Sequence, residues 1–303
     1  MLSVSNRKPK FRRVAPAKLP MLTERDLNIL ELLSRYRFLN ADHIRLLIAG
    51  SDEGIGRRLQ LLFHAGYVDR PAAQLEVFKA TENHAYVYAI GKDGAKALVE
   101  HNKREKMRSD WTTRNKTITK PAVRHFLAIA DVMSGFEHYA DKDFLSQYAL
   151  LNEKGDKLTA SWQTEILEEG KPMKIRVIPD QFFGVDFGPN AKSYFFLEAD
   201  KGSMPIRRSG PRQTSLMQKV QAYLASNSGK IPQEVLGIKH WRVIFVVPSL
   251  ERQKNLQQAI QDTTKGQGAG LFLIATYDAL KCKDPRNFPF INGRGEQVIF
   301  NQE

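Results

Sequence analysis

The sequence predicts a two-part fold of class α+β/α/β, an N-terminal winged helix-turn-helix followed by a mixed sheet flanked by helices. Three observations predict it. Three short amphipathic segments and two β-rich runs follow one another between residues 22 and 90. From about residue 145 onward, strand-like and helix-like segments alternate, which is typical of a sheet covered by helices. The length of 303 residues is sufficient for two domains of ordinary size.

Apolar spacing and caps predict the N-terminal elements. Leucines at helical spacing follow Thr23, which predicts a first helix up to Tyr36 with Thr23 as its N-cap. A second helix is predicted to begin at Asn40, and a third to run over 51–66. The runs 67–68 and 85–90 are rich in β-formers. The polar segment between these runs, which ends at residues 81–84, is therefore predicted to be the wing.

The third predicted helix is the one that enters the major groove in this fold. Its apolar residues at spacings of three and four leave the opposite face polar, and arginine and glutamine suit the edges of guanine and adenine. The alternative is an ordinary surface of a protein-interaction module. The residues of this helix predicted to contact DNA are Arg57, Arg58, Gln60 and His64.

Positive charge is concentrated in two segments. The net charge is +13, and residues 1–18 and 103–124 hold much of the excess. Such a chain is attracted to polyanions, so we expect double-stranded DNA as its partner, with Arg12 and Arg13 among the contacts. The alternative is a solvated surface without a specific partner. The predicted organisation is a basic arm at 1–20, a winged-helix domain at 21–101, a basic linker at 102–120 and a second domain at 121–303.

Three features bear on location. No apolar run is long enough for a membrane span, and the basic N-terminus lacks the apolar core of a signal peptide. The single cysteine, Cys282, excludes an internal disulfide and a cysteine-based zinc cluster. We therefore expect a cytoplasmic protein with no membrane partner. A homodimer is compatible with the sequence.

The second half predicts helices and strands in alternation. A helix is expected over 123–139. Two later strands, over 174–187 and 193–200, are expected to form an acidic hairpin. The remaining predicted elements are a helix over 211–226, a buried strand over 241–247, a helix from Ser249 and a strand over 271–275.

Carboxylates interrupt the hairpin where a simple core would be apolar. Alternation places Glu198 and Asp200 on one face of their strand, and Asp180 lies across the hairpin from them. Three converging carboxylates repel each other unless a cation offsets them, and Mg²⁺ or Mn²⁺ suits such a group. Lys219 is expected on the helix face that covers the sheet. The alternatives are salt bridges for the three acids and a solvent-directed Lys219.

Pro179-Asp180 followed by Glu198 on the next strand resembles the PD-(D/E)xK nuclease superfamily. The whole chain resembles the bacterial replication-relaxation family, which is associated with plasmid replication and mobilisation. That resemblance implies a winged helix followed by a restriction-endonuclease-like domain, a plasmid or mobile-element DNA site, and replication or transfer proteins as further partners. The segments that carry it are 22–33, 86–91, 124–131, 179–180, 197–202 and 219–223.

The sequence departs from the nuclease motif at one position. The motif has lysine two residues after the second acid, and this chain has Asp200 there. Lys219 could replace that lysine, as in migrated variants of the superfamily. His125 and Glu137 are additional candidates on the helix before the sheet, although either residue type is more often a packed or surface residue.

These residues predict metal-assisted phosphodiester hydrolysis that nicks or cleaves DNA. Asp180 and Glu198 would hold the metal, with Asp200 and Lys219 completing the catalytic group. The rival is a DNA-binding replication initiator or regulator whose nuclease domain is degenerate, and a third class is a scaffold without DNA affinity. No His-x-His pair and no phosphate-binding P-loop occurs, so a histidine-type relaxase site and an ATP-driven motor are not expected.

Overall fold

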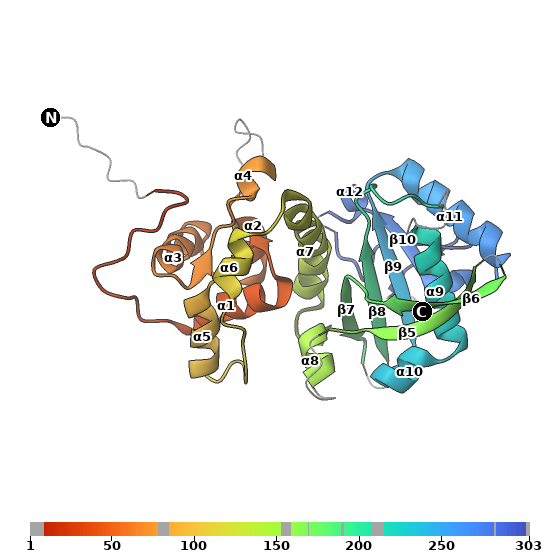
Figure 1. The fold of residues 1–303 in the computed structure, drawn as a ribbon, viewed down its shortest axis with the longest axis horizontal. Coiled ribbons are helices and arrows are strands. Elements are labelled where there is room, and N and C mark those ends of the chain that lie inside the picture. Colours follow the sequence, from red (N-terminus) through yellow and green to blue (C-terminus); the bar gives the residue numbers. More distant parts are fainter. Residues whose placement is uncertain are drawn as a thin grey trace. The chain divides into compact units, whose positions relative to one another are not determined.

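The computed structural model describes residues 9–77, 85–152, 159–168, 170–188, 191–207, 215–281 and 283–300. The chain divides into two compact units, Met1–Ala130 and Asp131–Glu303 (Figure 1). The division falls inside helix α7 (Lys120–Ala140), whereas the sequence-based prediction began the second domain at residue 121. The reason is packing, because Val123 and Leu127 at the start of α7 join the apolar cluster of the N-terminal sheet.

The three predicted N-terminal helices are present. They are α1 (Glu24–Tyr36), α2 (Ala41–Leu47) and α3 (Asp52–His64). Each begins after a polar cap, respectively Thr23, Asn40 and Ser51, whose side chain accepts a hydrogen bond from a backbone N–H of the first turn. The caps explain why the helix starts could be predicted to within a residue.

A small antiparallel sheet accompanies these helices. Its strands are β1 (Leu39–Asn40), β2 (Val68–Asp69) and β3 (Val87–Ile90), in the order β1-β3-β2. The short helix α4 (Gln74–Val77), which the sequence did not indicate, follows β2. The side-chain amide of Gln74 accepts a hydrogen bond from Val87 N at 2.9 Å and donates one to the Val87 carbonyl at 3.0 Å. Of the predicted wing between residues 68 and 85, residues 69–77 are described and include α4, and residues 78–84 lie outside the described residues.

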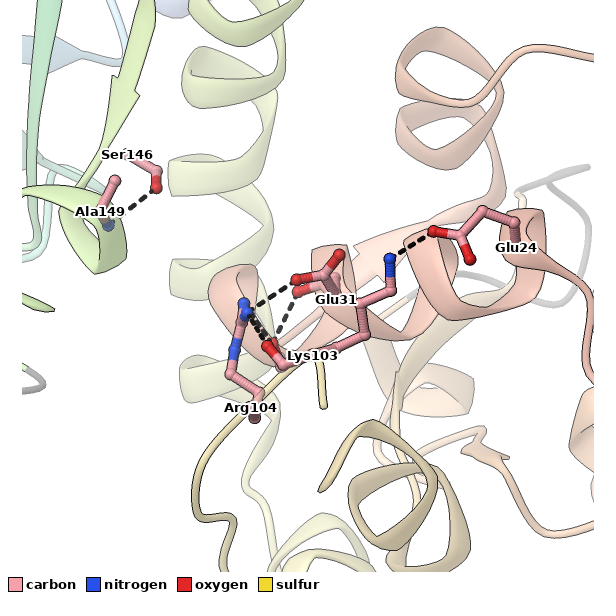
Figure 2. Close-up of polar contacts among 7 residues, drawn as sticks. Glu24, Glu31, Lys103, Arg104, Ser146 and Ala149 are labelled. Atoms are coloured by element: carbon pink, nitrogen blue, oxygen red, sulfur yellow. Dashed lines mark hydrogen bonds and ion pairs between the residues drawn. The ribbon is translucent and has the colours of Figure 1, made fainter. Parts of the chain in front are cut away.

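Residues 102–120, the predicted basic linker, fold onto the N-terminal unit. After helix α5 (Lys92–Glu100) the chain turns back along α1. There Lys103 pairs with Glu24, and Arg104 donates to Glu31 at 2.7 Å (Figure 2). Arg104 also donates to Ser34 at 3.3 Å. Complementary charges on α1 therefore hold this basic segment, and spacing along the sequence does not reveal them.

Helix α6 (Trp111–Lys116) completes the same attachment. Its Asn115 is buried and donates to Asp69 and to the Ile90 carbonyl, both at 2.8 Å. The segment is thus tied to strands β2 and β3.

Seven of the described strands form one mixed sheet in the second unit, which confirms the predicted sheet type. Their order is β12-β11-β10-β9-β8-β7-β4, with β8, β9 and β10 parallel to each other and the other pairs antiparallel. The strands are β4 (Phe144–Ser146), β7 (Gln181–Asp186), β8 (Lys192–Ala199), β9 (Trp241–Val247), β10 (Phe272–Thr276), β11 (Phe290–Asn292) and β12 (Gln297–Val298).

Helices cover both faces of this sheet. Phe195 on β8 packs against Phe136 of α7, and its neighbour Phe196 packs against Tyr223 of α9 (Leu216–Ser228). Successive residues of a strand point to opposite faces, so α7 and α9 lie on opposite sides. Helix α11 (Leu250–Thr264) contributes Leu256 and Ile260 to the core on the α9 side.

Several short elements were not predicted. A separate antiparallel pair, β5 (Trp162–Glu168) and β6 (Lys171–Val177), packs on α9, where Trp162 Nε1 donates to Ser226 at 2.8 Å. The predicted single strand over 174–187 is therefore divided between two sheets, because residues 174–177 belong to β6 and residues 181–186 form β7. The others are η1 (Asp141–Asp143), α8 (Gln147–Asn152), α10 (Ile231–Leu236), η2 (Ala269–Leu271) and α12 (Tyr277–Leu280). Among the helices that the described residues form, none is both long and apolar enough to cross a bilayer.

Candidate functional site

Asp180 is fixed at the open end of the β7–β8 hairpin. It directly precedes β7, where Gln181 pairs with Leu197 of β8. Its N–H donates to the Leu197 carbonyl at 3.0 Å, and its Oδ2 accepts from Ala199 N at 2.8 Å. The hairpin register therefore places Asp180 across the ladder from Glu198, as the sequence predicted.

Glu198 is the second-to-last residue of β8, and its side chain faces helix α9. Its side chain is only 3% exposed. Its Oε2 accepts from Lys219 Nζ, and its Oε1 accepts from the Tyr223 hydroxyl at 2.7 Å. Lys219 and Tyr223 are four residues apart on one face of α9, so one helix supplies both donors. Lys219 therefore lies beside the acidic hairpin, and its part in the chemistry stays a prediction.

The charges of this group do not balance. Burial raises the pKa of Glu198 to about 7; Lys219 opposes that rise, and the nearby Asp180 carboxylate adds to it. Burial lowers the pKa of Lys219, but Glu198 and Asp180 outweigh it and the net shift is upward. The two shifts have different main causes: burial dominates for Glu198, and the neighbouring carboxylates dominate for Lys219.

Asp200 is held by a different cation. It follows β8 and is buried, with Oδ1 accepting from Gly202 N at 3.0 Å. Arg252, in the first turn of α11, donates to both carboxylate oxygens and also to the Met204 carbonyl. The alternative of a salt bridge therefore describes Asp200. Sequence reasoning did not single out Arg252, because it lies 52 positions from Asp200 and no sequence pattern signals the contact.

A tyrosine hydroxyl lies near the same acids. Tyr277, at the start of α12, has a buried hydroxyl with no hydrogen-bond partner among the described residues. Burial raises its pKa, and Asp200, Asp180 and Asp131 raise it further. Lys201 Nζ lies 5.3 Å from the centre of its ring. Tyr277 and Tyr223 are thus two aromatic neighbours of the acidic group that the sequence analysis missed. The helical spacing from Lys219 could have identified Tyr223.

The donor set determines what the group could bind. Within the described part of the chain, no three His, Cys, Asp or Glu side chains are placed together as a ready metal site. Asp180 and Glu198 nevertheless lie close enough to raise the pKa of Glu198. Mg²⁺ commonly takes only one or two carboxylates and completes its shell with water and phosphate oxygens. The pair fits such an ion, with Glu198 giving up part of its contact to Lys219.

Two of the predicted DNA-contacting residues on α3 are placed as expected. Arg57 has a side chain 73% exposed and makes only a 3.5 Å pair with Glu53 one turn earlier, and Gln60 is exposed. Arg58 differs, because its Nε donates to the buried Asp26 at 2.6 Å and its Nη2 to the Met21 carbonyl at 2.7 Å. Arg58 therefore ties α3 to α1.

The placement of His64 on the exposed face was wrong. His64 is 3% exposed, because the N-terminal arm crosses it and Val14 N donates to its Nδ1 at 3.1 Å. Arg13 anchors the arm by pairing with Asp69 and donating to the Phe63 carbonyl at 2.9 Å. Arg12 stays exposed.

The two additional candidates lie on α7 but in different units. His125 belongs to the N-terminal unit, with its ring 6.0 Å from that of Phe126, and Glu137 belongs to the second unit. The acidic group of Asp180 and Glu198 therefore has at most Glu137 of these two within its own unit.

Comparison with known proteins gives one match. The family model described as replication-relaxation matches residues 30–237, a stretch that includes the hairpin acids and Lys219 and ends before Arg252. This confirms the resemblance of the chain to the replication-relaxation family. No curated protein and no solved structure matches the chain.

Proposed function

The chain belongs to the replication-relaxation family, and from that premise we propose that it binds duplex DNA at a plasmid or mobile-element site and nicks or cleaves it by metal-dependent hydrolysis. The family itself indicates a role in plasmid replication or mobilisation. The observation that carries the finer proposal is the meeting of Asp180, Glu198 and Lys219 at one end of the β7–β8 hairpin.

The metal would be held by Asp180 and Glu198. A bound Mg²⁺ or Mn²⁺ lowers the pKa of a coordinated water and offsets negative charge on a phosphate. Burial, with Asp180 adding to it, raises the pKa of Glu198 to about 7, and a bound cation would favour the ionised form again. Asp180 is already oriented by its backbone contacts, so little of its freedom would be lost on binding.

Lys219 supplies the positive group that the usual motif carries two residues after the second acid. Its side chain is 35% exposed, so the ammonium reaches both Glu198 and solvent. An ammonium has three donors, and Glu198 Oε2 takes one of them. The others are available to orient a water or to stabilise charge on the scissile phosphate. Tyr223 keeps Glu198 in place when Lys219 turns to the substrate.

The N-terminal unit would place the reaction on DNA. We take it as a winged helix in which α3 enters the major groove, with Arg57 and Gln60 as base-reading residues. Arg12 would contact the backbone from the arm. Arg13 and Arg58 contribute by holding the arm and α3, because their guanidinium groups are engaged within the unit.

The test is cleavage of supercoiled plasmid with Mg²⁺ or Mn²⁺ by the wild type, Asp180→Asn, Glu198→Gln and Lys219→Met. Asp186→Asn is the matched control, since Asp186 ends the strand that Asp180 precedes and pairs only loosely with Lys192, at 3.7 Å. We expect nicking by the wild type and the control, and its loss in the three site variants with DNA binding retained. Equal nicking by wild type and site variants would assign the cleavage to something else.

One observation favours a second candidate, a DNA-binding initiator or regulator that does not cut. Asp200 is neutralised by Arg252, and both oxygens of Glu198 are already hydrogen bonded. A protein of this kind would bind DNA in a salt-sensitive way. It would show no cleavage with either metal, and that result would decide for it.

A further inference from the structure

A strained arginine stands at the C-terminal end of α1. Arg37 has φ 67° and ψ −53°, a conformation that L residues with a side chain rarely adopt. Its guanidinium carbon lies 4.9 Å from the ring centre of Phe38 and 4.5 Å from that of Trp111. Backbone strain of this kind persists only where the surrounding structure holds the residue in place, and it is common at functional sites. A strained residue is therefore a reason to look for a function.

Two donors in this contact lack acceptors. Arg37 Nη1 and Trp111 Nε1 are both shielded from solvent, and neither donates a hydrogen bond to any described residue. Buried N–H groups are nearly always paired, because leaving one unpaired forfeits its hydration without return. Stacking on the rings attracts the guanidinium as a whole but gives no acceptor to these N–H groups.

The acids nearest to Arg37 are committed to other partners. Asp69 accepts from Arg13 and from Asn115, and Asp110 forms a two-pronged pair with Arg108 at 2.9 and 3.1 Å. Burial lowers the pKa of Arg37 to about 10, with Arg114 as the next contribution in the same direction. The surroundings of Arg37 therefore hold an uncompensated positive charge.

We propose that Arg37 and Trp111, with Arg114 beside them, form a binding site for a phosphate group. A phosphate presents several acceptor oxygens and negative charge, and so it satisfies both the guanidinium and the indole N–H. The source is either a backbone phosphate of DNA or free inorganic phosphate. With DNA as the source, the site rests on the proposed function and adds a backbone contact outside α3.

The experiment follows the indole N–H signal of Trp111 in the full chain. The protein has three tryptophans, and Trp111→Phe identifies the signal by its loss. Inorganic phosphate is titrated in one arm and a short duplex DNA in the other. We expect the signal to shift in the wild type and in Lys96→Gln, a control that removes an exposed charge on α5. In Arg37→Gly, where glycine adopts the positive φ without strain, the shift should be lost.

Salt dependence separates the two sources. If DNA fills the site, the slope of log affinity against log salt should fall by about one in Arg37→Gly and stay unchanged in Lys96→Gln. A shift with phosphate alone and an unchanged slope would assign the site to free phosphate. A Trp111 signal that neither probe moves overturns the site. Failure of the wild type to bind DNA at all would count against the proposed function, and the phosphate arm would still test the site.

Discussion

Two buried carboxylates, one in each unit, have opposite pKa shifts. Asp26 on α1 is fully buried and Glu198 on β8 is 3% exposed. Burial raises the pKa of Asp26, but hydrogen bonds from Arg58 and Thr23 outweigh it and the net shift is downward. For Glu198, burial prevails, and the pKa rises to about 7. Low solvent exposure alone therefore does not decide the charge state of an acid.

The difference lies in the partners. The Asp26 carboxylate receives two guanidinium N–H groups from Arg58, and one hydroxyl and one backbone N–H from Thr23. Glu198 receives one ammonium and one hydroxyl, and Asp180 repels it. A satisfied acid of the first kind holds a fold together. A buried acid with too few hydrogen-bond donors and cations around it, such as Glu198, is a candidate for a catalytic or cation-binding role.

The largest effect should come from breaking the satisfied pair. We expect Arg58→Ala to lower the free energy of unfolding by about 4 kcal/mol, because it leaves the Asp26 charge buried without a cation. Arg57→Ala, one position earlier on the same helix and exposed, should change it by less than about 0.5 kcal/mol. Urea unfolding of the two variants measures the contrast. Similar losses in both would refute a structural role specific to Arg58.

The pH dependence of stability should show the two acids with opposite signs. Glu198 binds its proton more tightly when folded, at a pKa of about 7 against an ordinary 4.5. Its contribution is therefore full below pH 4.5 and is lost as the pH rises to about 7, a change of about 3 kcal/mol. Asp26, whose pKa is lowered, contributes above its ordinary 3.8 and loses that contribution as the pH falls further.

The measurement is urea unfolding of wild type, Glu198→Gln and Asp26→Asn between pH 3 and pH 8. Glu198→Gln should flatten the decline between pH 5 and 7, and Asp26→Asn should alter only the acid side. If the decline survives in Glu198→Gln, the under-compensated state of Glu198 is not its cause.

The predictable parts of both regions are the local ones. Thr23 with Asp26 predicts the start of α1, and alternation on β8 predicts that Glu198 faces the covering helix. The partners that decide the roles are distant in the chain. Arg58 is 32 residues from Asp26, and Arg252 is 52 from Asp200, so only the folded chain brings them together.

The same limit explains His64 and the predicted linker. Helical spacing placed His64 on an open face, because spacing does not show that Val14 of the arm covers it. The charged composition of residues 102–120 predicted a linker. It does not show that acids on α1, about 70 to 80 residues away in the chain, bind Lys103 and Arg104. Sequence patterns specify elements and faces, whereas tertiary contacts decide which charged groups remain available.

A smaller effect is expected from divalent cations. Mg²⁺ at ten times its dissociation constant should stabilise the wild type by about 1.4 kcal/mol, since it binds the folded pair of Asp180 and Glu198. Asp180→Asn should abolish the stabilisation, and Asp186→Asn should keep it. Thermal unfolding with and without Mg²⁺ at pH 8 gives the comparison. The same gain in all three proteins would place the cation elsewhere.

The smallest and most discriminating change removes one hydroxyl from each acid. Thr23 Oγ1 donates to Asp26 and the Tyr223 hydroxyl to Glu198, each at 2.7 Å. Thr23→Val and Tyr223→Phe should each cost about 1 kcal/mol of stability. Only Tyr223→Phe should move the pH profile of plasmid nicking, to higher pH, because that hydroxyl favours the ionised form of Glu198. Nicking assays between pH 6 and pH 9 test this, and matching shifts in both variants would show that Glu198 is no more functional than Asp26.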